Sequence, residues 1–540
     1  MKKLVSLLLA LIMVLSMSSI ALAADEPVEL TLAVIRRATD ISNSYNERAW
    51  VKDAEKALNV KLTFVELPEG SHAEPLAGLL AGEQIDVYFM GMHFADSIIT
   101  ENPGMFHAYT MDEIKTYAPT YYALAEEYVE DWQTFTTWPD GNIYGLMGHN
   151  AKQATGLLQG IQYLNYQWLE NLDLEVPTTM DEFYNVLVAF RDQDPNMNGV
   201  KDEIPIDFCN ANYAGDIMYF ASSWGLALGD NGEPLYTVTD DDRVVGAMNT
   251  QAYREFLEFF HKLAEEGLLN IEGLTQTKEQ WDANLSAGKV GVFWTWGPYN
   301  NIPTELKLEY NYFVPVPAEG YETKIYPNNP IRANRDGWVI TKRAEEAGKV
   351  EIAMKLYDYW CTPANSLNVQ LGPQGIAWEW VDEANLIYKT IPTPVEAEDP
   401  EGYAAYCAKM KEAGYEHLID KTYNGSNTIG YQNSAPLFVK AAQYDMTDTT
   451  HNTVRRILSE QAFSAVFANR APSVLIPAEV SEELKFMTDG LSSYINGFCA
   501  ESILNGVTDD SWNAYLKGLE TYNYSYLVEY YDKLIQGTLF

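Results

Sequence analysis

The chain has few cysteines, and their spacing excludes the usual cysteine-based sites. Among its 540 residues there are only four, Cys209, Cys361, Cys407 and Cys499, and no two of them form a C-x-x-C pair. Neither a zinc site nor a dithiol redox site is supported, because both depend on closely spaced thiolates. Disulfide pairing and four free, buried thiols both remain compatible with the sequence.

Familiar catalytic motifs are also missing. The chain contains no G-x-S-x-G, no H-E-x-x-H and no Walker A stretch, and its seven histidines are scattered. Paired carboxylates could hydrolyse glycosides, but with 76 acidic residues a pair means nothing without geometry. The sequence therefore predicts a protein that is not an enzyme.

Positive charge is scarce. The chain has 36 Lys and Arg residues against 76 Asp and Glu, which gives a formal net charge of −40. A field of this sign repels nucleic acid and anionic lipid, and it disfavours polyanionic ligands unless a local basic patch overrides it. The hydrophobic content of 47% excludes a disordered chain, and the length predicts two lobes or domains.

Long apolar runs are confined to the N-terminus. Lys2 and Lys3 precede an apolar run over 4–15, and Ala21 and Ala23 form an A-x-A cleavage site. This pattern is typical of a secretory signal peptide over residues 1–23, and no later stretch reaches the roughly 18 apolar residues of a membrane helix. Because no cysteine stands at the cleavage point, we expect export to the cell envelope or medium without a lipid anchor.

The first 150 residues alternate strand and helix patterns. Strands are expected at 28–35, 60–65 and 85–90, with helices at 50–58 and 76–82. Such β-α-β-α-β alternation predicts a parallel sheet covered by helices on both faces. Ligands of these sheets bind beyond the carboxyl ends of the strands. The residues expected near a cleft there are Arg36, Arg37, Met92, His93 and Asp96.

The patterns of the remaining chain are less regular. Residues 164–194 are expected to form two helices separated at Pro177, with Thr178 as the N-cap of the second. Further strands are expected at 143–147 and 337–341, and helices at 253–267 and 350–360. The last third of the chain is expected to be helical.

The segment Asp194–Glu203, DPNMNGVKDE, resembles the start of an EF-hand calcium loop. Oxygen-bearing side chains alternate at its first, third and fifth positions, and a glycine stands at the sixth. The candidate ligands are Asp194, Asn196, Asn198, the Val200 carbonyl, Asp202 and Glu203. The pattern departs at position twelve, where Pro205 replaces glutamate, so Glu203 would supply the closing carboxylate. A solvated turn is the alternative interpretation.

Two indoles stand at the end of a strand pattern in the segment GKVGVFWTWGPY, residues 288–299. Trp294 and Trp296 share one face, and Gly297-Pro298 stops the strand. Aromatic rings at a strand end can form an apolar platform for a sugar, whereas burial in a core is the alternative. Tyr299, Trp338 and Trp378 are further candidates for such contacts.

Taken in order, these motifs resemble a known family. DGNIYGL (140–146), LNYQWLENL (164–172) and AGKVGVFWTWGPY (287–299) are similar to segments of the extracellular, maltose-binding-like solute-binding proteins of ABC importers. The calcium-type loop and DDSWNAYLKGLE (509–520) resemble the subgroup that includes alginate-oligosaccharide-binding proteins. The resemblance covers nearly the whole mature chain.

The resemblance implies an α/β fold of two lobes, of the type II periplasmic-binding-protein kind, that closes on its ligand by hinge motion. Residues 25–150 and about 335–385 would form the N-terminal lobe, and about 151–334 and 386–540 the other. It also implies a monomer that delivers an oligosaccharide to importer membrane subunits, sugar contacts by Trp296 and Tyr299, and structural calcium.

Two other functions remain open from the sequence. An exported glycoside hydrolase or polysaccharide lyase would need positioned acid/base groups in the cleft. A peptide-binding protein could hold a carboxylate with Arg36, Arg37, Arg332 and Arg335. The same arginines could hold a uronic acid, so they do not decide the ligand.

Overall fold

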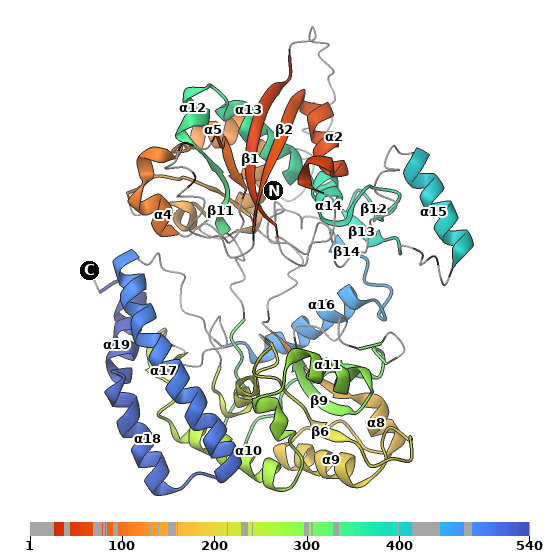
Figure 1. The fold of residues 1–540 in the computed structure, drawn as a ribbon, viewed down its shortest axis with the longest axis vertical. Helices are drawn as coiled ribbons and strands as arrows, with labels where there is room; N and C mark the ends of the chain where they lie inside the picture. The colour runs from red at the N-terminus through yellow and green to blue at the C-terminus, as the bar shows by residue number, and fades with distance from the viewer. Residues whose placement is uncertain are drawn as a thin grey trace.

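The computed structural model describes most of the chain after residue 25. The described residues are 26–36, 44–68, 78, 82, 84–89, 96–129, 132–138, 140–148, 158, 160–212, 214–227, 236–239, 241–295, 302–303, 306–327, 334–392, 394, 396, 399–412, 443–468 and 478–538. The expected signal peptide, and nearly all of the helix expected at 76–82, lie outside them. Figure 1 shows two lobes, one above the other along the long axis.

The first lobe is built on a five-stranded sheet. Its strand order is β2 (Val60–Pro68), β1 (Val28–Arg36), β3 (Val87–Phe89), β11 (Asn334–Ile340) and β4 (Leu146–Gly148). β1 runs parallel to β2 and β3, as predicted, whereas β11 is antiparallel to both β3 and β4. The predicted strands and the helix α2 (Ala49–Leu58) are confirmed, with bounds shifted by at most three residues.

Alternating side chains bury both faces of this sheet. Leu32 and Val34 of β1 join a core cluster with Trp360, and Ala33 joins a second cluster with Val339. The helices of this lobe include α2, α4 (Asp96–Glu101), α5 (Met111–Tyr117), α6 (Pro119–Tyr128), α7 (Trp132–Thr136), α12 (Lys342–Glu346), α13 (Val350–Cys361) and α14 (Pro363–Leu371). The expected helix at 350–360 is therefore confirmed as α13.

The outer edge of β2 is capped by side chains. The Phe64 N–H donates to Asn46 Oδ1 at 2.7 Å, and Asn46 Nδ2 donates to the Phe64 carbonyl at 3.1 Å. Two residues earlier in the strand, Glu55 Oε1 of α2 accepts from the Leu62 N–H at 2.9 Å. These bonds satisfy backbone groups that would otherwise template pairing with another chain.

The second lobe contains a four-stranded sheet in the order β10 (Tyr310–Tyr312), β5 (Ile161–Asn165), β9 (Val290–Thr295) and β6 (Ile204–Ile206). Its helices include α8 (Tyr166–Asn171), α9 (Met180–Asp192), α10 (Gln251–Glu265) and α11 (Lys278–Ser286), with the 3₁₀ helix η3 (Ile217–Trp224). Leu164 and Asn165 belong to β5 rather than to the predicted helix. The N-cap of α9 is Thr179 and not Thr178, because Thr179 accepts from the Glu182 N–H.

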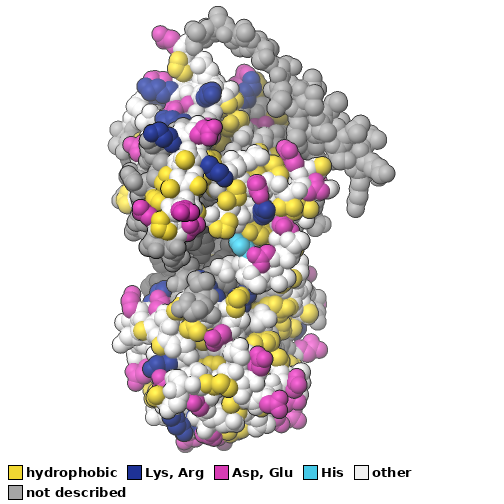
Figure 2. Space-filling model, turned by 90° about the vertical axis from the view of Figure 1, so that its right-hand side faces the viewer, with side chains coloured by type: hydrophobic (Ala, Val, Ile, Leu, Met, Phe, Trp, Pro, Cys, Tyr) yellow, Lys and Arg dark blue, Asp and Glu magenta, His cyan; other side chains and the backbone are white. Residues whose placement is uncertain are grey.

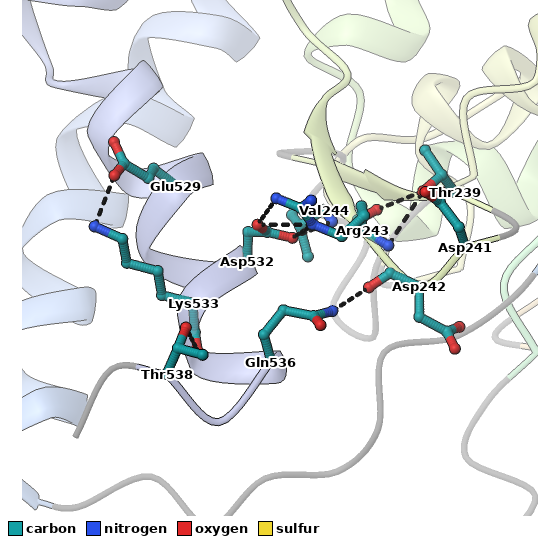
Figure 3. A network of polar contacts seen from close by, with 10 residues as sticks. All are labelled: Thr239, Asp241, Asp242, Arg243, Val244, Glu529, Asp532, Lys533, Gln536 and Thr538. Atoms are coloured by element: carbon teal, nitrogen blue, oxygen red, sulfur yellow. Dashed lines mark hydrogen bonds and ion pairs between the residues drawn. The ribbon is translucent and has the colours of Figure 1, made fainter.

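Three C-terminal helices, α17 (Ala478–Asn505), α18 (Asp509–Thr521) and α19 (Tyr524–Ile535), pack on the second lobe. Figure 3 shows how α19 holds the hairpin of β7 (Tyr236–Val238) and β8 (Val244–Gly246). Asp532 accepts from Arg243 Nε at 2.9 Å and from the Val244 N–H at 2.9 Å. The prediction that the C-terminal region is helical is thereby confirmed.

A small sheet and one helix connect the lobes. β12 (Trp378–Asp382), β13 (Ile387–Thr390) and β14 (Gln443–Tyr444) follow α14, and α16 (Asn452–Phe463) comes after them. Val454 and Ile457 of α16 pack with Trp378 and Tyr388, whereas Phe463 lies in the core of the second lobe. Arg455 Nη1 donates to the Lys307 carbonyl at 2.8 Å. α16 therefore packs on the small sheet near its start and on the core of the second lobe at its end.

The four cysteines are all free thiols, and three of them are buried. Cys407 is the half-buried exception, in α15 (Pro400–Glu412).

Figure 2 shows charged side chains of both signs over the surface of each lobe. None of the helices in the described part of the chain combines the length and apolar character needed to cross a membrane.

We predict that acid weakens the start of α16. His451 is its N-cap and accepts the Thr453 N–H on Nδ1 at 3.2 Å, while its ring stacks on Tyr444. Burial lowers the pKa of His451, against the opposing charge of Asp448, so the fold favours the neutral ring. As the pH falls below the ordinary value of 6.5, the unfolded chain takes up this proton first and stability is lost.

The matched variant is His451→Asn, which keeps a capping acceptor but does not titrate. Between pH 7.5 and pH 5.5, the melting temperature of the wild type should fall further than that of the variant. Equal falls in both proteins would contradict the prediction.

Candidate functional site

One edge of the first sheet faces the other lobe. The chain leaves this sheet after Gly148 and returns at Asn334, and these two residues pair across β4 and β11. The pairings of β3 with β11 and of β1 with β2 place Arg36 and Pro68 at that same edge. The carboxyl ends of the parallel strands are therefore turned towards the second lobe (Figure 1). This is where ligands of α/β sheets bind.

The Glu66 carboxylate accepts hydrogen bonds from three residues at this edge. Glu66 Oε2 accepts from Arg36 Nη1 at 2.7 Å, and Oε1 accepts from Ser44 Oγ and from the Tyr45 N–H, both at 2.6 Å. Burial raises the pKa of Glu66, but the hydrogen bonds from Ser44, Arg36 and Tyr45 together hold it below its ordinary value. Arg36 thus lies where the sequence predicted, but it is paired with a carboxylate.

A second arginine at the edge lies over aromatic rings. The Arg335 guanidinium is 4.6 Å from the ring centre of Phe135 and 5.9 Å from that of Trp138. Trp138 meets Tyr144 edge to face, and the Tyr144 hydroxyl donates to Asp140 at 2.6 Å. Burial, with help from Asp140, raises the pKa of Tyr144 to about 12. Tyr144 and Asp140 of the DGNIYGL segment therefore hold Trp138, one of the rings that lie against Arg335.

On the second lobe, the matching position is the end of β9. Thr295 pairs with Ile161, the first residue of β5, so the end of β9 lies beside the start of the first strand of this lobe. Trp294 fills the space beneath: its ring stacks on Tyr219 at 5.4 Å and meets Phe463 of α16 edge to face. A Cβ at Gly160 would come within 2.5 Å of the indole nitrogen, which shows how closely the ring packs.

The structure separates the predicted aromatic contacts into two groups. Trp294, Trp338 and Trp378 are core residues, with exposed fractions of 1%, 0% and 0%, so none presents its ring to a ligand. Trp338 stacks on Tyr357, and Trp378 Nε1 donates to the Gly372 carbonyl at 2.9 Å. Of the residues that the sequence predicted at the site, those that lie outside the described part of the chain are Arg37, Met92, His93, Trp296, Tyr299 and Arg332. Asp96 is described only as the first residue of α4.

Glu66, Ser44 and Phe135 were not selected from the sequence. Glu66 could have been predicted, because it stands near the carboxyl end of a parallel strand, as Arg36 does. The predicted second strand ended at Val65, however, whereas β2 continues to Pro68. Ser44 and Phe135 carry no comparable signal, since only tertiary contacts bring them to this edge.

The predicted calcium loop follows α9 and has its oxygens turned inward. Asp194 Oδ2 accepts from the Gly199 N–H at 2.9 Å, and Asn196 Oδ1 accepts from the Asn198 N–H at 3.1 Å. Burial, with the charges of Asp194 and Asp202, raises the pKa of Glu203, whose Oε1 is buried with no hydrogen-bond partner. Converging carboxylates with an unpaired acceptor are an arrangement that a cation would stabilise.

Other contacts of the loop oppose that arrangement in part. Asp202 bonds to the Lys289 ammonium at 3.0 Å and to Asn198 Nδ2 at 3.0 Å. Among the described residues, no group of three His, Cys, Asp or Glu side chains is placed to hold a metal. Coordination would therefore depend on amide and carbonyl oxygens as well, as in calcium loops generally.

We predict that Trp294→Ala costs about 3–5 kcal/mol of unfolding free energy, as is usual for removing a buried indole. The ring bridges β9, η3 and α16, so its loss leaves a cavity that these elements cannot easily close. Urea denaturation measures the change, and Trp294→Phe, which keeps a ring, should lose less. A loss below about 1 kcal/mol for the alanine variant would show that the ring is not part of the core.

Several known proteins match the chain by sequence. It is 27% identical over 438 residues to the fructooligosaccharide ABC transporter substrate-binding protein FusA of Streptococcus pneumoniae, covering 78% of this chain and 75% of that protein. It is 25% identical over 245 residues, 45% of each chain, to the polygalacturonan/rhamnogalacturonan-binding protein YtcQ of Bacillus subtilis. No protein-family model matches the chain.

Solved structures match the fold over nearly the whole chain. An extracellular solute-binding protein from Bifidobacterium longum subsp. infantis has a TM-score of 0.76 at 22% identity, covering 96% of this chain and 99% of that one. FusA, as an EF-hand mutant in complex with fructo-nystose, has a TM-score of 0.69 at 21% identity, covering 94% and 99%.

The chain therefore has the two-lobed fold of the solute-binding proteins, as the sequence predicted. By sequence it is similar to an ABC transporter substrate-binding protein, and by fold it is similar to an extracellular solute-binding protein.

Proposed function

We propose that the protein captures an oligosaccharide between its lobes and delivers it to the membrane subunits of an ABC importer, without catalysing a reaction. The observation that carries this proposal is the similarity to FusA, a fructooligosaccharide-binding protein, over most of both chains. A domain-level match would leave the function open, but here the similarity extends over 78% of the chain.

The edge of the first lobe supports a sugar ligand. Arginine side chains and the half-buried Phe135 ring lie there, and both kinds of group suit a glycan, whose hydroxyls need polar partners and whose CH faces stack on rings. Trp296, two residues beyond the buried Trp294, is the proposed ring on the opposite side. Closure of the lobes would bring the two sides together. The proposed lobe boundaries are those given by the sequence, and export by a signal peptide is part of the proposal.

The function is tested by binding measurements with the purified mature chain. Isothermal titration with fructo-oligosaccharides, oligogalacturonides and short peptides should give saturable binding to a glycan and none to peptides. Trp296→Ala should weaken glycan binding at least about tenfold, or 1.4 kcal/mol, because a stacking surface is lost. Its melting temperature should stay near that of the wild type, in contrast to Trp294→Ala.

Two outcomes would redirect the proposal. Release of shortened sugars during incubation would indicate a hydrolase or lyase. Peptide binding without glycan binding would assign the arginines at the edge to a peptide carboxylate.

We also infer a structural calcium ion in the 194–203 loop, held by Asp194, Asn196, Asn198, the Val200 carbonyl, Asp202 and Glu203. The buried, unpaired Glu203 Oε1 is the observation in its favour. A bound ion would offset the mutual repulsion of the three carboxylates and fix α9 against β6. The loop precedes β6, which runs parallel to β9, so it lies at the opposite end of these strands from Thr295. The ion would therefore stabilise the lobe without contacting a ligand.

Chelation should therefore lower the melting temperature of metal-loaded protein. An ion at a hundredfold excess over its dissociation constant contributes about 2.7 kcal/mol. Asp194→Ala should abolish the effect of the chelator, whereas Asp192→Ala, an acidic neighbour outside the ligand set, should retain it. A melting temperature that is insensitive to chelator after stripping and reloading would remove the site from the proposal.

A further inference from the structure

A buried carboxylate stands directly after β6, and within the described part of the chain its hydrogen-bond partners are all neutral. Asp207 is 0% exposed. Asn270 Nδ2 and Gln276 Nε2 donate to its Oδ1 at 2.8 and 2.9 Å, and Asn284 Nδ2 donates to its Oδ2 at 3.0 Å. The Phe208 N–H also donates to Oδ1, at 2.9 Å. Because a carboxylate is costly to bury without a cation, these four donors are needed for the ionised form to persist.

The Asp207 network fixes the chain segment that follows β6. Gln276 Nε2 donates to the Phe208 carbonyl as well as to Asp207. The Asn210 N–H donates to the Gly273 carbonyl at 3.2 Å. The approach is close, since a Cβ at Gly273 would lie 2.6 Å from the Phe208 carbonyl oxygen. The backbone from Phe208 to Asn210 is therefore held by contacts with the segment around Gly273 and Gln276.

The held segment lies at the same edge of the second sheet as the end of β9. β6 runs parallel to β9, and the Asp207 N–H donates to the Val292 carbonyl at 3.0 Å, so both strands run towards this edge. Gly160, the residue before β5, also lies close by, since a Cβ there would be 3.3 Å from the Ala214 carbonyl oxygen. Because the start of β5 pairs with Thr295, the chain after Asp207 lies near the position that matches the ligand edge of the first lobe.

We propose that Asn210 and Asn212 hydrogen-bond to glycan hydroxyls on the second lobe, and that Asp207 is the positioning residue that holds them in place. The inference rests on the proposed function and deepens it, because it assigns the contacts that the second lobe makes with the hydroxyl groups of the ligand.

Both asparagines have side-chain amides available to a ligand. Asn210 is exposed, and its Oδ1 accepts from the Ile217 N–H at 3.2 Å, so the oxygen is held while Nδ2 has no partner among the described residues. Asn212 is half-buried, and its amide makes no hydrogen bond within the described part of the chain. A Cβ at Gly215 would lie 3.1 Å from Asn212 Nδ2, so this glycine leaves the space that the amide occupies.

Amides in a fixed position suit a neutral ligand. An amide donates and accepts hydrogen bonds, as a hydroxyl does, and carries no charge. Groups that are already ordered lose little entropy when a ligand binds. The Asp207 oxygens supply this order, because they join donors from three points of the chain, Asn270, Gln276 and Asn284 of α11. An amide in place of the carboxylate would set an N–H group against those donors and release the segment.

The contacts are tested by Asn210→Ala and Asn212→Ala, with Asn249→Ala as the matched control. Asn249 is an exposed asparagine of the same lobe, but it lies near Gly246 of β8 and not at the end of β6. Titration calorimetry with a fructo-oligosaccharide and an oligogalacturonide gives the dissociation constant for the glycan that the wild type binds. Each of the first two variants should bind it about three- to tenfold more weakly, as expected for one lost hydrogen bond. The control should bind as the wild type does.

The positioning role is tested with Asp207→Asn, and Asp532→Asn is its control. Asp532 is also a buried carboxylate of this lobe, but it accepts from Arg243 and from the Val244 N–H at the β7–β8 hairpin. Both changes should lower the melting temperature, whereas only Asp207→Asn should weaken glycan binding by the folded protein. Because Asp207 acts through the asparagines, the double variant Asp207→Asn/Asn212→Ala should lose less affinity than the product of the two single fold changes.

Each outcome bears on one part of the proposal. If Asp207→Asn does not fold, Asn284→Ala, which removes one of its donors, takes its place in the same cycle. Dissociation constants that stay within about twofold of the wild type in both alanine variants would overturn the contacts. Fold changes of Asp207→Asn and Asn212→Ala that multiply fully would overturn the positioning role. A wild type that binds neither glycan would instead refute the proposed function itself.

Discussion

The return of β11 into the first sheet is the constraint on which the two-lobed arrangement depends. The chain leaves at Gly148, builds most of the second lobe, and comes back between β3 and β4. This insertion requires a close approach: a Cβ at Gly337 would lie 2.6 Å from the Gly148 nitrogen and 2.9 Å from the Leu146 carbonyl. Because β11 pairs with β4, the two segments that join the lobes leave the first sheet side by side.

Local patterns predicted most of the fold. The apolar alternation of β1, the amphipathic α10 and the buried strand β11 all depend on residues that are near in sequence, and their bounds were close to those found. The antiparallel direction of β11 was not predicted, since nothing local distinguishes a strand that continues a parallel sheet from one that returns from another lobe. The expected caps differed by one residue because Thr178 and Thr179 are equally good acceptors in sequence, and only the turn geometry selects Thr179.

The candidate site was predictable only in part. Strand-end reasoning placed Arg36 at the carboxyl ends of the parallel strands, because that position follows from parallel topology. It could not tell which aromatic residues face a ligand: period-2 alternation groups Trp294 with Trp296, but burial of Trp294 depends on Tyr219 and Phe463, which are distant in sequence. The partner of Arg36 was hidden for the same reason, since Glu66 is 30 residues away in the chain. Contacts at long range, rather than motifs, decide what this edge can bind.

The two anchors of α16 differ in kind, and this has a mechanical consequence. Arg455 and Arg456 donate to backbone carbonyls of the second lobe, and such directional bonds weaken steeply when the groups shift. Val454 and Ile457, which flank the two arginines in the same turn, rest on the β12–β14 sheet through apolar contacts, which tolerate small sliding displacements. Rotation of one lobe against the other should therefore be taken up at the apolar contact, so that α16 moves with the second lobe and slides on that small sheet.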